Sequence, residues 1–223
     1  MFRRVLPQGS RSLLADIERD TPASLRGWTL AGGTGLALRL GHRLSDDFDF
    51  FKQARFSRQG LFTSLSKLGG CEVLQEEAGT LTVLLRGIKL SFFQIPDPFL
   101  FAAETFSFFR LADARDIALM KLVAVLNRGS RKDFVDLYCL LRRGGSLAEH
   151  LGLLVKKYGS GRVNLYQVLQ SLTWFEEAEA EPSPRMLEPF DWKECKAFFR
   201  REARGLVLPE GGPPSGRGPA ERD

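Results

Sequence analysis

The sequence predicts a protein of the α/β (α+β) class, with a mixed α/β half over residues 1–100 and a helical half over residues 101–208. Two observations predict this division. Up to about residue 100, short apolar segments with strand periodicity alternate with helical segments, and glycine-containing turns separate them. The pattern changes after Pro96 and Pro98, and from Asp113 to Ala203 almost every segment has helical spacing. Residues 209–223 are rich in proline, glycine and charge, so we expect a disordered tail there.

Glycines mark the ends of the expected elements in the first half. Between them, amphipathic repeats indicate helices and short apolar runs indicate strands. We expect helices over 11–20, 34–41 and 58–68, and strands over 28–31, 48–51, 72–74, 81–85 and 89–95. In the second half, we expect capping boxes at the starts of three helices, with the pairs Ser130/Asp133, Ser146/Glu149 and Asp191/Glu194.

Composition excludes several kinds of site. The chain has three widely separated cysteines and two histidines, so neither a disulfide framework nor a Cys/His zinc site is expected. Carboxylates remain as metal ligands, and they suit Mg²⁺. The apolar stretches stop short of the roughly 20 residues of a membrane span, and the start lacks a signal-peptide core, so we expect a cytoplasmic protein with no membrane partner. A net charge of +5 indicates an RNA partner or, equally well, a solubilising surface.

Two aspartates at alternate positions of one expected strand form the first candidate site. Side chains alternate faces along a strand, so Asp47 and Asp49 point one way while Phe48 and Phe50 point the other. Their Cα atoms then lie roughly 7 Å apart. Repulsion and loss of solvent would raise at least one pKa, and a divalent cation would remove that cost. The alternative interpretation is an exposed acidic edge without a ligand.

A glycine-lined helix start precedes this pair in the sequence. Gly32 and Gly33 lie between an expected strand and an expected helix, where backbone N–H groups can approach a phosphate without an intervening Cβ. Thr34 would cap that helix or donate its hydroxyl to the same anion. Many Gly-Gly pairs are simple turns, but a phosphate cradle and metal ligands together are what nucleoside triphosphate chemistry requires.

The helical half contains one lysine within an apolar helix. Lys121 is surrounded in sequence by aliphatic residues, and an unpaired buried ammonium is costly. We therefore expect Lys121 to reach a carboxylate or a bound phosphate, the alternative being a lysine that extends to solvent and only supports the fold. In the next helix, Asp133 fits either a cap with Ser130 or a site residue, whereas Asp136 lies one turn too far along to be a cap.

Two segments carry a resemblance to a known family. GGTGLALRLGHRLSDDFDFF (residues 32–51) resembles the first motif of the AbiEii/AbiGii-type toxin nucleotidyltransferases, which belong to the polymerase-β-like nucleotidyltransferase superfamily. DIALMKLVAVLNRGSRKDFVDLYCLL (residues 116–141) resembles that family's second signature. The likeness covers most of residues 28–200 and implies a polymerase-β-like sheet with flanking helices, followed by a helical part that completes the active site.

The resemblance also implies residue roles and partners. Asp47 and Asp49 would hold Mg²⁺ (or Mn²⁺), Lys121 would contact phosphate, and Asp136 or Asp133 would complete the acidic site. The implied nucleotide-binding residues are Gly32, Gly33, Thr34, Arg43, Ser45, Arg128, Lys132 and Asp133. The implied activity is transfer of a nucleoside monophosphate from a nucleoside triphosphate (NTP) to an acceptor, with the 3′ end of tRNA or another RNA expected. The protein would act as the toxin of a toxin–antitoxin or abortive-infection pair, with a cognate antitoxin protein as a partner.

One departure from the superfamily pattern leaves alternatives open. Many members carry a third acid on a later strand, but the stretch GIKLSFFQI has Ser91 and no carboxylate. Either one metal ion suffices, or Asp136 takes the missing place. Two other functions also remain: transfer of nucleotide or phosphate to a protein hydroxyl, and a non-catalytic nucleotide- or RNA-binding module. A basic surface of Arg142, Arg143, Lys156 and Lys157 would face RNA or be a plain solvated face.

Overall fold

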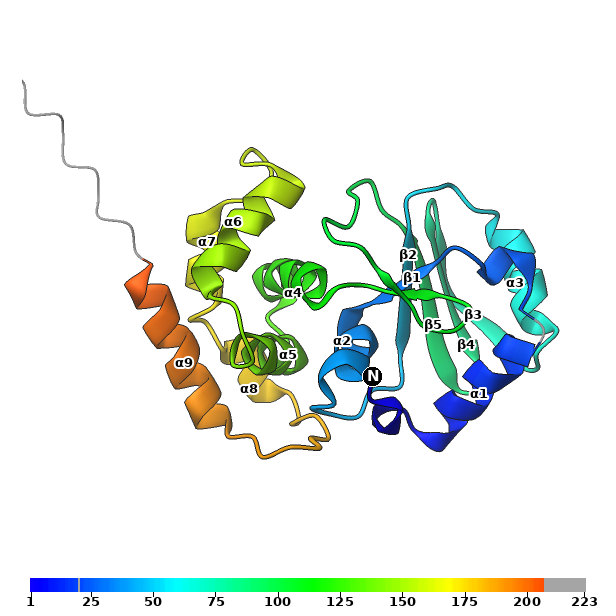
Figure 1. Ribbon diagram of the computed structural model, residues 1–223, viewed down its shortest axis with the longest axis horizontal. Coiled ribbons are helices and arrows are strands. Elements are labelled where there is room, and N and C mark those ends of the chain that lie inside the picture. The colour runs from blue at the N-terminus through cyan, green and yellow to red at the C-terminus, as the bar shows by residue number, and fades with distance from the viewer. Residues whose placement is uncertain (20, 207–223) are drawn as a thin grey trace, which may run out of the picture.

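The first half of the chain forms a sheet with helices on it (Figure 1). The computed structural model describes residues 1–19 and 21–206. The strands are β1 (Thr29–Ala31), β2 (Phe48–Lys52), β3 (Cys71–Glu77), β4 (Thr80–Leu85), β5 (Ile88–Gln94), β6 (Glu104–Thr105) and β7 (Arg110–Leu111). The helices of this half are α1 (Gln8–Arg19), α2 (Gly32–Leu40) and α3 (Arg58–Ser66), with 3₁₀ turns η1 (Arg3–Val5) and η2 (Ala23–Leu25).

The strand order in the sheet is β3-β4-β5-β2-β1-β7-β6. β2 lies at its middle, antiparallel to β1 and parallel to β5. In this register Asp49 is opposite Ala31 on one side and Ser91 on the other. The residue at which β1 passes into α2 therefore lies beside the aspartate strand.

The two faces of the sheet belong to different cores. Phe48, Phe50 and Phe92 point into a core with α1, α3 and η1. Phe51 and Phe93 point to the other face, where the helical half packs. This alternation confirms the expected strand geometry, and it places Asp49 on the face that meets the helices.

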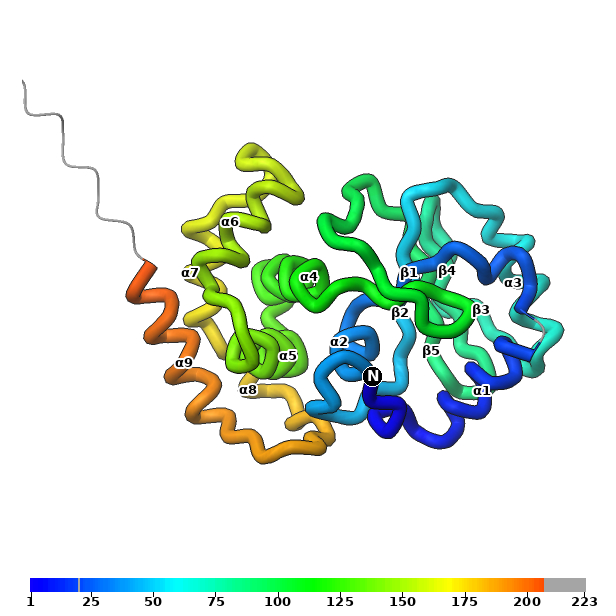
Figure 2. Tube along the Cα trace, viewed as in Figure 1, coloured from blue at the N-terminus to red at the C-terminus, as the bar shows by residue number. Residues whose placement is uncertain are grey.

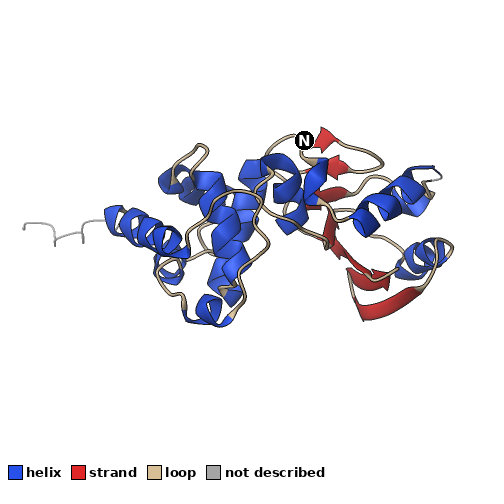
Figure 3. Cartoon of the chain, turned by 90° about the horizontal axis from the view of Figure 1, so that it is seen from below, coloured by secondary structure: helices blue, strands red, loops and turns tan. Residues whose placement is uncertain are grey.

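The second half is helical and lies to one side of the sheet (Figure 3). Its helices are α4 (Ala114–Arg128), α5 (Arg131–Leu141), α6 (Leu147–Tyr158), α7 (Leu165–Ser171), α8 (Glu176–Ala180) and α9 (Trp192–Gly205). Figure 2 follows the chain from β7 into α4, which contacts α2, α5, α6 and α7. Because neighbours surround it, α4 is apolar on most of its circumference, and this explains the near-continuous apolar sequence around Lys121.

The structure corrects two expectations about the elements. The sheet continues past residue 100, because β6 and β7 pair beside β1; two-residue strands are too short to give a periodic signal. Of the expected capping boxes, only the one at Ser146 has both hydrogen bonds; Asp191 caps α9 through the Lys193 N–H alone, and the Ser130 side chain makes no cap. The expected tail over 209–223 lies outside the described residues.

No helix among the described residues is both long and apolar enough to span a membrane.

Candidate functional site

A polar cavity of about 660 Å³ opens where the sheet meets the helical half. Its walls come from the starts of α2 and β2, from β5, from the end of α4 and the start of α5, and from the segment before α9. The lining residues are Gly33, Thr34, Arg43, Leu44, Ser45, Asp46, Asp47, Asp49, Lys89, Lys121, Arg128, Ser130, Lys132, Asp133, Glu181, Pro182, Ser183, Pro184 and Arg185. Both halves of the chain thus contribute charged side chains to one space.

The two aspartates predicted to share a face both line this cavity. Asp47 precedes β2 and Asp49 lies within it, while the intervening Phe48 is fully buried on the opposite face. Burial raises the pKa of Asp49, and the neighbouring Asp47 raises it further, although Lys121 and Lys89 act in the opposite direction. Asp49 is therefore the carboxylate with the expected raised pKa, and a bound cation would stabilise its ionised form.

The Gly32-Gly33 loop lies directly against these groups. Gly32 has φ of +63°, and a Cβ at this position would collide with the Asp49 carboxylate. A Cβ at Gly33 would collide with the Arg43 guanidinium. α2 begins at Gly32, so the free N–H groups of its first turn lie beside the aspartate pair. The predicted proximity of the acids and the loop is therefore present in the structure.

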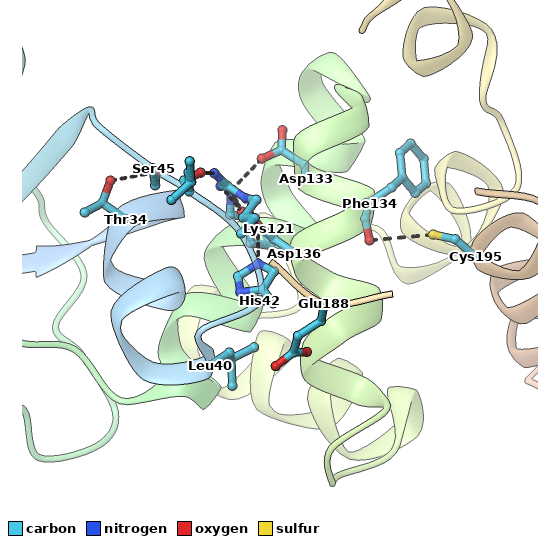
Figure 4. A network of polar contacts seen from close by, with 12 residues as sticks. Thr34, Leu40, His42, Ser45, Lys121, Asp133, Phe134, Asp136, Glu188 and Cys195 are labelled. Atoms are coloured by element: carbon cyan, nitrogen blue, oxygen red, sulfur yellow. Dashed lines mark hydrogen bonds and ion pairs between the residues drawn. The ribbon is translucent and has the colours of Figure 1, made fainter. Parts of the chain in front are cut away.

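Thr34 and Ser45 link the start of α2 to the segment before β2. The Thr34 hydroxyl donates to the main-chain carbonyl of Asp47, and the hydroxyls of Thr34 and Ser45 lie 2.8 Å apart (Figure 4). The capping role considered for Thr34 is wrong, because the helix begins before it and its N-cap residue is Ala31. With its only proton engaged, Thr34 is placed to fix the position of Asp47.

Asp136 is the centre of a buried ion cluster. It is fully buried, and its two oxygens contact Arg43 at 2.6 and 2.9 Å, Lys121 at 2.7 Å and His42 at 2.8 Å. His42 donates from Nε2, since a carboxylate only accepts. Burial alone would raise the pKa of Asp136, but Lys121 and Arg43 hold it well below its usual range.

Asp133 also pairs with cations. It lies 2.8 Å from Lys121 Nζ and accepts from Arg128 at 2.7 and 3.0 Å. The capping alternative with Ser130 is wrong, because the carboxylate turns toward α4. Lys121, pairing with both Asp133 and Asp136, reaches carboxylates as expected. Burial lowers the pKa of Lys121, but the two aspartates outweigh it and raise the pKa, so the ammonium stays charged beside the cavity.

Asp136 itself is not among the residues that line the cavity. Four donor atoms already surround its carboxylate, so it holds Lys121 and Arg43 in place and has no free oxygen for a metal or a nucleotide. The alternative in which Asp136 replaces the missing third acid is therefore not supported. Ser91 occupies that position in the sheet, directly beside Asp49, and is nearly fully buried.

Two cations that line the cavity were not singled out from the sequence. Lys89 on β5 is exposed and precedes Ser91 by two residues, so strand alternation alone would have placed it on the face of Asp49. Arg185 comes from an irregular segment and pairs with Asp46 at 3.7 Å; no sequence signal indicated it. Together with the predicted Arg128 and Lys132, these residues bring four cations to the cavity, where Asp46 and Glu181 also lie.

The basic surface considered for RNA is not continuous. Lys157 is buried, and its ammonium contacts Asp116 at 2.7 Å and the Pro98 carbonyl at 2.9 Å. Arg143 pairs with Glu188. Both side chains stabilise contacts between segments, so the sequence cluster does not form one open patch.

The acids at the cavity fit a magnesium ion that shares its ligands with a substrate. Within the described part of the chain, no three or more His, Cys, Asp or Glu side chains gather into a metal-binding group. Mg²⁺, however, is commonly held by one or two carboxylates together with substrate phosphates and water. The desolvated Asp49 and its neighbour Asp47 provide that donor set.

The fold is that of nucleotidyltransferases. MenT4, a nucleotidyltransferase toxin from Mycobacterium tuberculosis H37Rv, superposes with a TM-score of 0.55 at 18% identity, covering 86% of this chain and 79% of that one. JHP933 from Helicobacter pylori superposes with a TM-score of 0.53 at 16% identity, covering 91% of each chain.

The sequence identifies the family within this fold. Residues 13–205 match the family described as "Nucleotidyl transferase AbiEii toxin, Type IV TA system", and the chain belongs to that family. An uncharacterised protein of Aquifex aeolicus (strain VF5) is 40% identical over 180 residues, which is 78% of this chain and 85% of the relative. The family resemblance of the two sequence motifs is thereby confirmed.

Proposed function

We propose that this protein transfers a nucleoside monophosphate from an NTP to the 3′ end of an RNA, with tRNA as the acceptor. One observation carries the proposal: two neighbouring carboxylates face the free amides of a glycine-lined helix start, inside a cavity that lysine and arginine side chains also line. Amides and cations bind polyphosphate, and carboxylates hold the divalent ion that accompanies it. The resemblance of residues 32–51 and 116–141 to the toxin nucleotidyltransferases supports an RNA acceptor, and a net charge of +5 suits a polyanionic partner.

Asp47 and Asp49 would hold Mg²⁺ (or Mn²⁺). When bound, the ion supplies charge neutralisation at the phosphates and a lower pKa for the attacking hydroxyl. With Ser91 beside Asp49, the sheet contributes two acids to this task.

Backbone amides and cationic side chains bind and orient the triphosphate. The first amides of α2, at Gly32 and Gly33, receive phosphate oxygens. Lys121 stays charged beside the cavity, and Arg128 and Lys132 reach its rim from α4 and α5. The acceptor hydroxyl attacks the α-phosphorus, a phosphodiester bond forms and pyrophosphate leaves. The fixed amides and cations stabilise the negative charge that develops.

A second set of residues acts by positioning. Asp136 and Asp133 hold the Lys121 ammonium at 2.7 and 2.8 Å, so that its direction is fixed before substrate arrives. Asp136 also binds Arg43 through two hydrogen bonds, which keeps that guanidinium against Gly33. Preorganised charges of this kind contribute more than mobile ones.

The family also suggests a cellular setting. As a member of a type IV toxin–antitoxin family, the protein would have an antitoxin as its cognate partner and would act in the cytoplasm, where NTPs and tRNA are found.

Incubation of the purified protein with total RNA tests the proposal. NTPs labelled at the α-phosphate are compared with NTPs labelled at the γ-phosphate, and RNA and protein are separated afterwards. We expect α-label in an RNA band of tRNA size and none from γ-label. Label in protein would show a protein acceptor, γ-label in any product would show phosphate transfer, and the absence of label with intact NTP binding would show a non-catalytic module. Each of these three results contradicts the proposal.

A further inference from the structure

A second cavity, of about 480 Å³, adjoins the first. It lies between the ends of β2 and β5 and the last turns of α4. Five residues line both cavities: Gly33, Asp49, Lys121, Arg128 and Asp133. The two spaces thus meet beside the aspartate and the buried lysine.

The chemistry of the two cavities differs. The first collects charged side chains, whereas the second is walled beyond the junction by apolar ones: Phe51, Phe93, Ile95, Met120, Val123 and Ala124. The rings of Phe51 and Phe93 are stacked, with centroids 5.2 Å apart and planes 24° from parallel. Phe93 is half-buried, so part of its side chain stays accessible. Met120 and Val123 form the facing wall on α4, and a flat aromatic ligand fits between such walls.

Two carboxamides stand at the edge of this apolar space. Gln94 donates to the main-chain carbonyl of Gln53 at 3.2 Å. Asn127 is exposed, and within the described residues its side-chain amide makes no hydrogen bond. A carboxamide presents a donor and an acceptor side by side, which matches the edge of a nucleobase. Asn127 is therefore free to bind such an edge.

We propose that the second cavity binds the nucleobase of the incoming NTP and that Asn127 selects among bases. This inference rests on the proposed function and assigns its nucleotide orientation. One molecule would span both cavities, with its phosphates at the cations of the first and its base between the apolar walls of the second. Its α-phosphate then lies at the junction, beside Asp49, where the reaction requires it.

The opposite assignment, with the terminal base of the acceptor in the second cavity, fits less well. In an NTP, one ribose connects the triphosphate, a polyanion, to a flat base. The two cavities are connected in the same way: the first is lined by cations, the second is apolar, and both are lined by Asp49 and Lys121. The match of both parts to one ligand favours the NTP.

Calorimetric titration of the full chain in Mg²⁺ without RNA tests the assignment. The ligands are the four NTPs and inorganic tripolyphosphate, which lacks a base. Met120→Trp fills the cavity, so we expect NTP affinity to fall at least about tenfold while tripolyphosphate binding is unchanged. Asn127→Ala leaves the fold intact because the side chain is exposed, and we expect the preference for the best NTP over the others to fall by about tenfold.

Gln170→Ala is the matched control, because this exposed carboxamide borders a neighbouring cavity with Asn127 but does not line the second cavity. It should leave all affinities unchanged. Equal loss of NTP and tripolyphosphate, or unchanged NTP selectivity in Asn127→Ala, would overturn the assignment. So would unchanged NTP binding by Met120→Trp, which would leave the cavity to the acceptor. Because no acceptor is needed, normal binding without any transfer would contradict only the proposed function.

Discussion

Removing the charge of Asp136 should destabilise the protein more than removing any surface acid. Its two oxygens meet four donor atoms, from His42, Arg43 and Lys121, at 2.6–2.9 Å, and the side chain is fully buried. In Asp136→Asn, one oxygen becomes an NH₂ group that faces donors. Arg43 loses its carboxylate partner, and Lys121 keeps only Asp133. Breaking a buried ion pair in this way costs about 3–5 kcal/mol.

Thermal unfolding measures this cost. For a chain of this size, 1 kcal/mol shifts the melting temperature by about 2–4 °C, so Asp136→Asn should lower it by roughly 6–20 °C at pH 7. Asp97→Asn is the control, since Asp97 pairs with Arg162 near the surface, where a pair contributes no more than about 1 kcal/mol. A shift for Asp136→Asn no larger than that of the control would refute the buried-cluster account.

The pH dependence gives a second readout of the same cluster. Because the pKa of Asp136 is well below its usual range in the folded protein, its stabilisation is present above the unfolded pKa of about 4 and is lost as the pH falls through the folded value. The difference in melting temperature between wild type and Asp136→Asn should therefore be constant near neutral pH and shrink in acid below about pH 4. A difference that grows in acid would contradict the assigned direction.

Three further predictions concern the site itself. The pKa of Asp49 is raised in the folded protein, so its ionised form destabilises the fold as the pH rises above about 4. Asp49→Asn should therefore raise the melting temperature at pH 7 without metal, and an unchanged or lower melting temperature would contradict this direction. Gly32→Ala should lower the free energy of unfolding by about 1–2 kcal/mol and remove most of the transfer activity, because φ is +63° and the new Cβ collides with Asp49. Gly70→Ala is the control: a Cβ there lies in open space, so denaturation and activity assays should show no change. Lys89→Ala should weaken NTP binding by roughly tenfold without changing stability, with the exposed Lys67→Ala as a control that leaves calorimetric affinity unaltered.

The positions of the two aspartates and the glycine loop could be predicted because they follow from local rules. Alternation along a strand puts Asp47 and Asp49 on one face, and Gly32 marks the sharp turn from β1 into α2. The need of the buried Lys121 for carboxylates follows from desolvation alone. None of these inferences requires knowledge of which segments pack together.

The remaining features depend on long-range packing, which one sequence does not encode in a readable pattern. His42 and Arg43 contact Asp136 from more than 90 residues away in the sequence. The sequence therefore did not indicate that donors from these residues already occupy both oxygens of the Asp136 carboxylate. Thr34 looked like a cap until the helix start was known. Lys157 looked like part of a basic surface, yet it is buried against Asp116 because α6 packs on α4.

The most direct test of the account is a comparison of pyrophosphate release and α-label incorporation by wild type and Asp49→Asn, with RNA, Mg²⁺ and a melting curve for each protein. We expect wild type to label RNA and to release one pyrophosphate per nucleotide added, while the variant stays folded and does neither. Undiminished incorporation by a folded Asp49→Asn protein would contradict the claim that this carboxylate pair, held against the glycine loop, carries out the transfer.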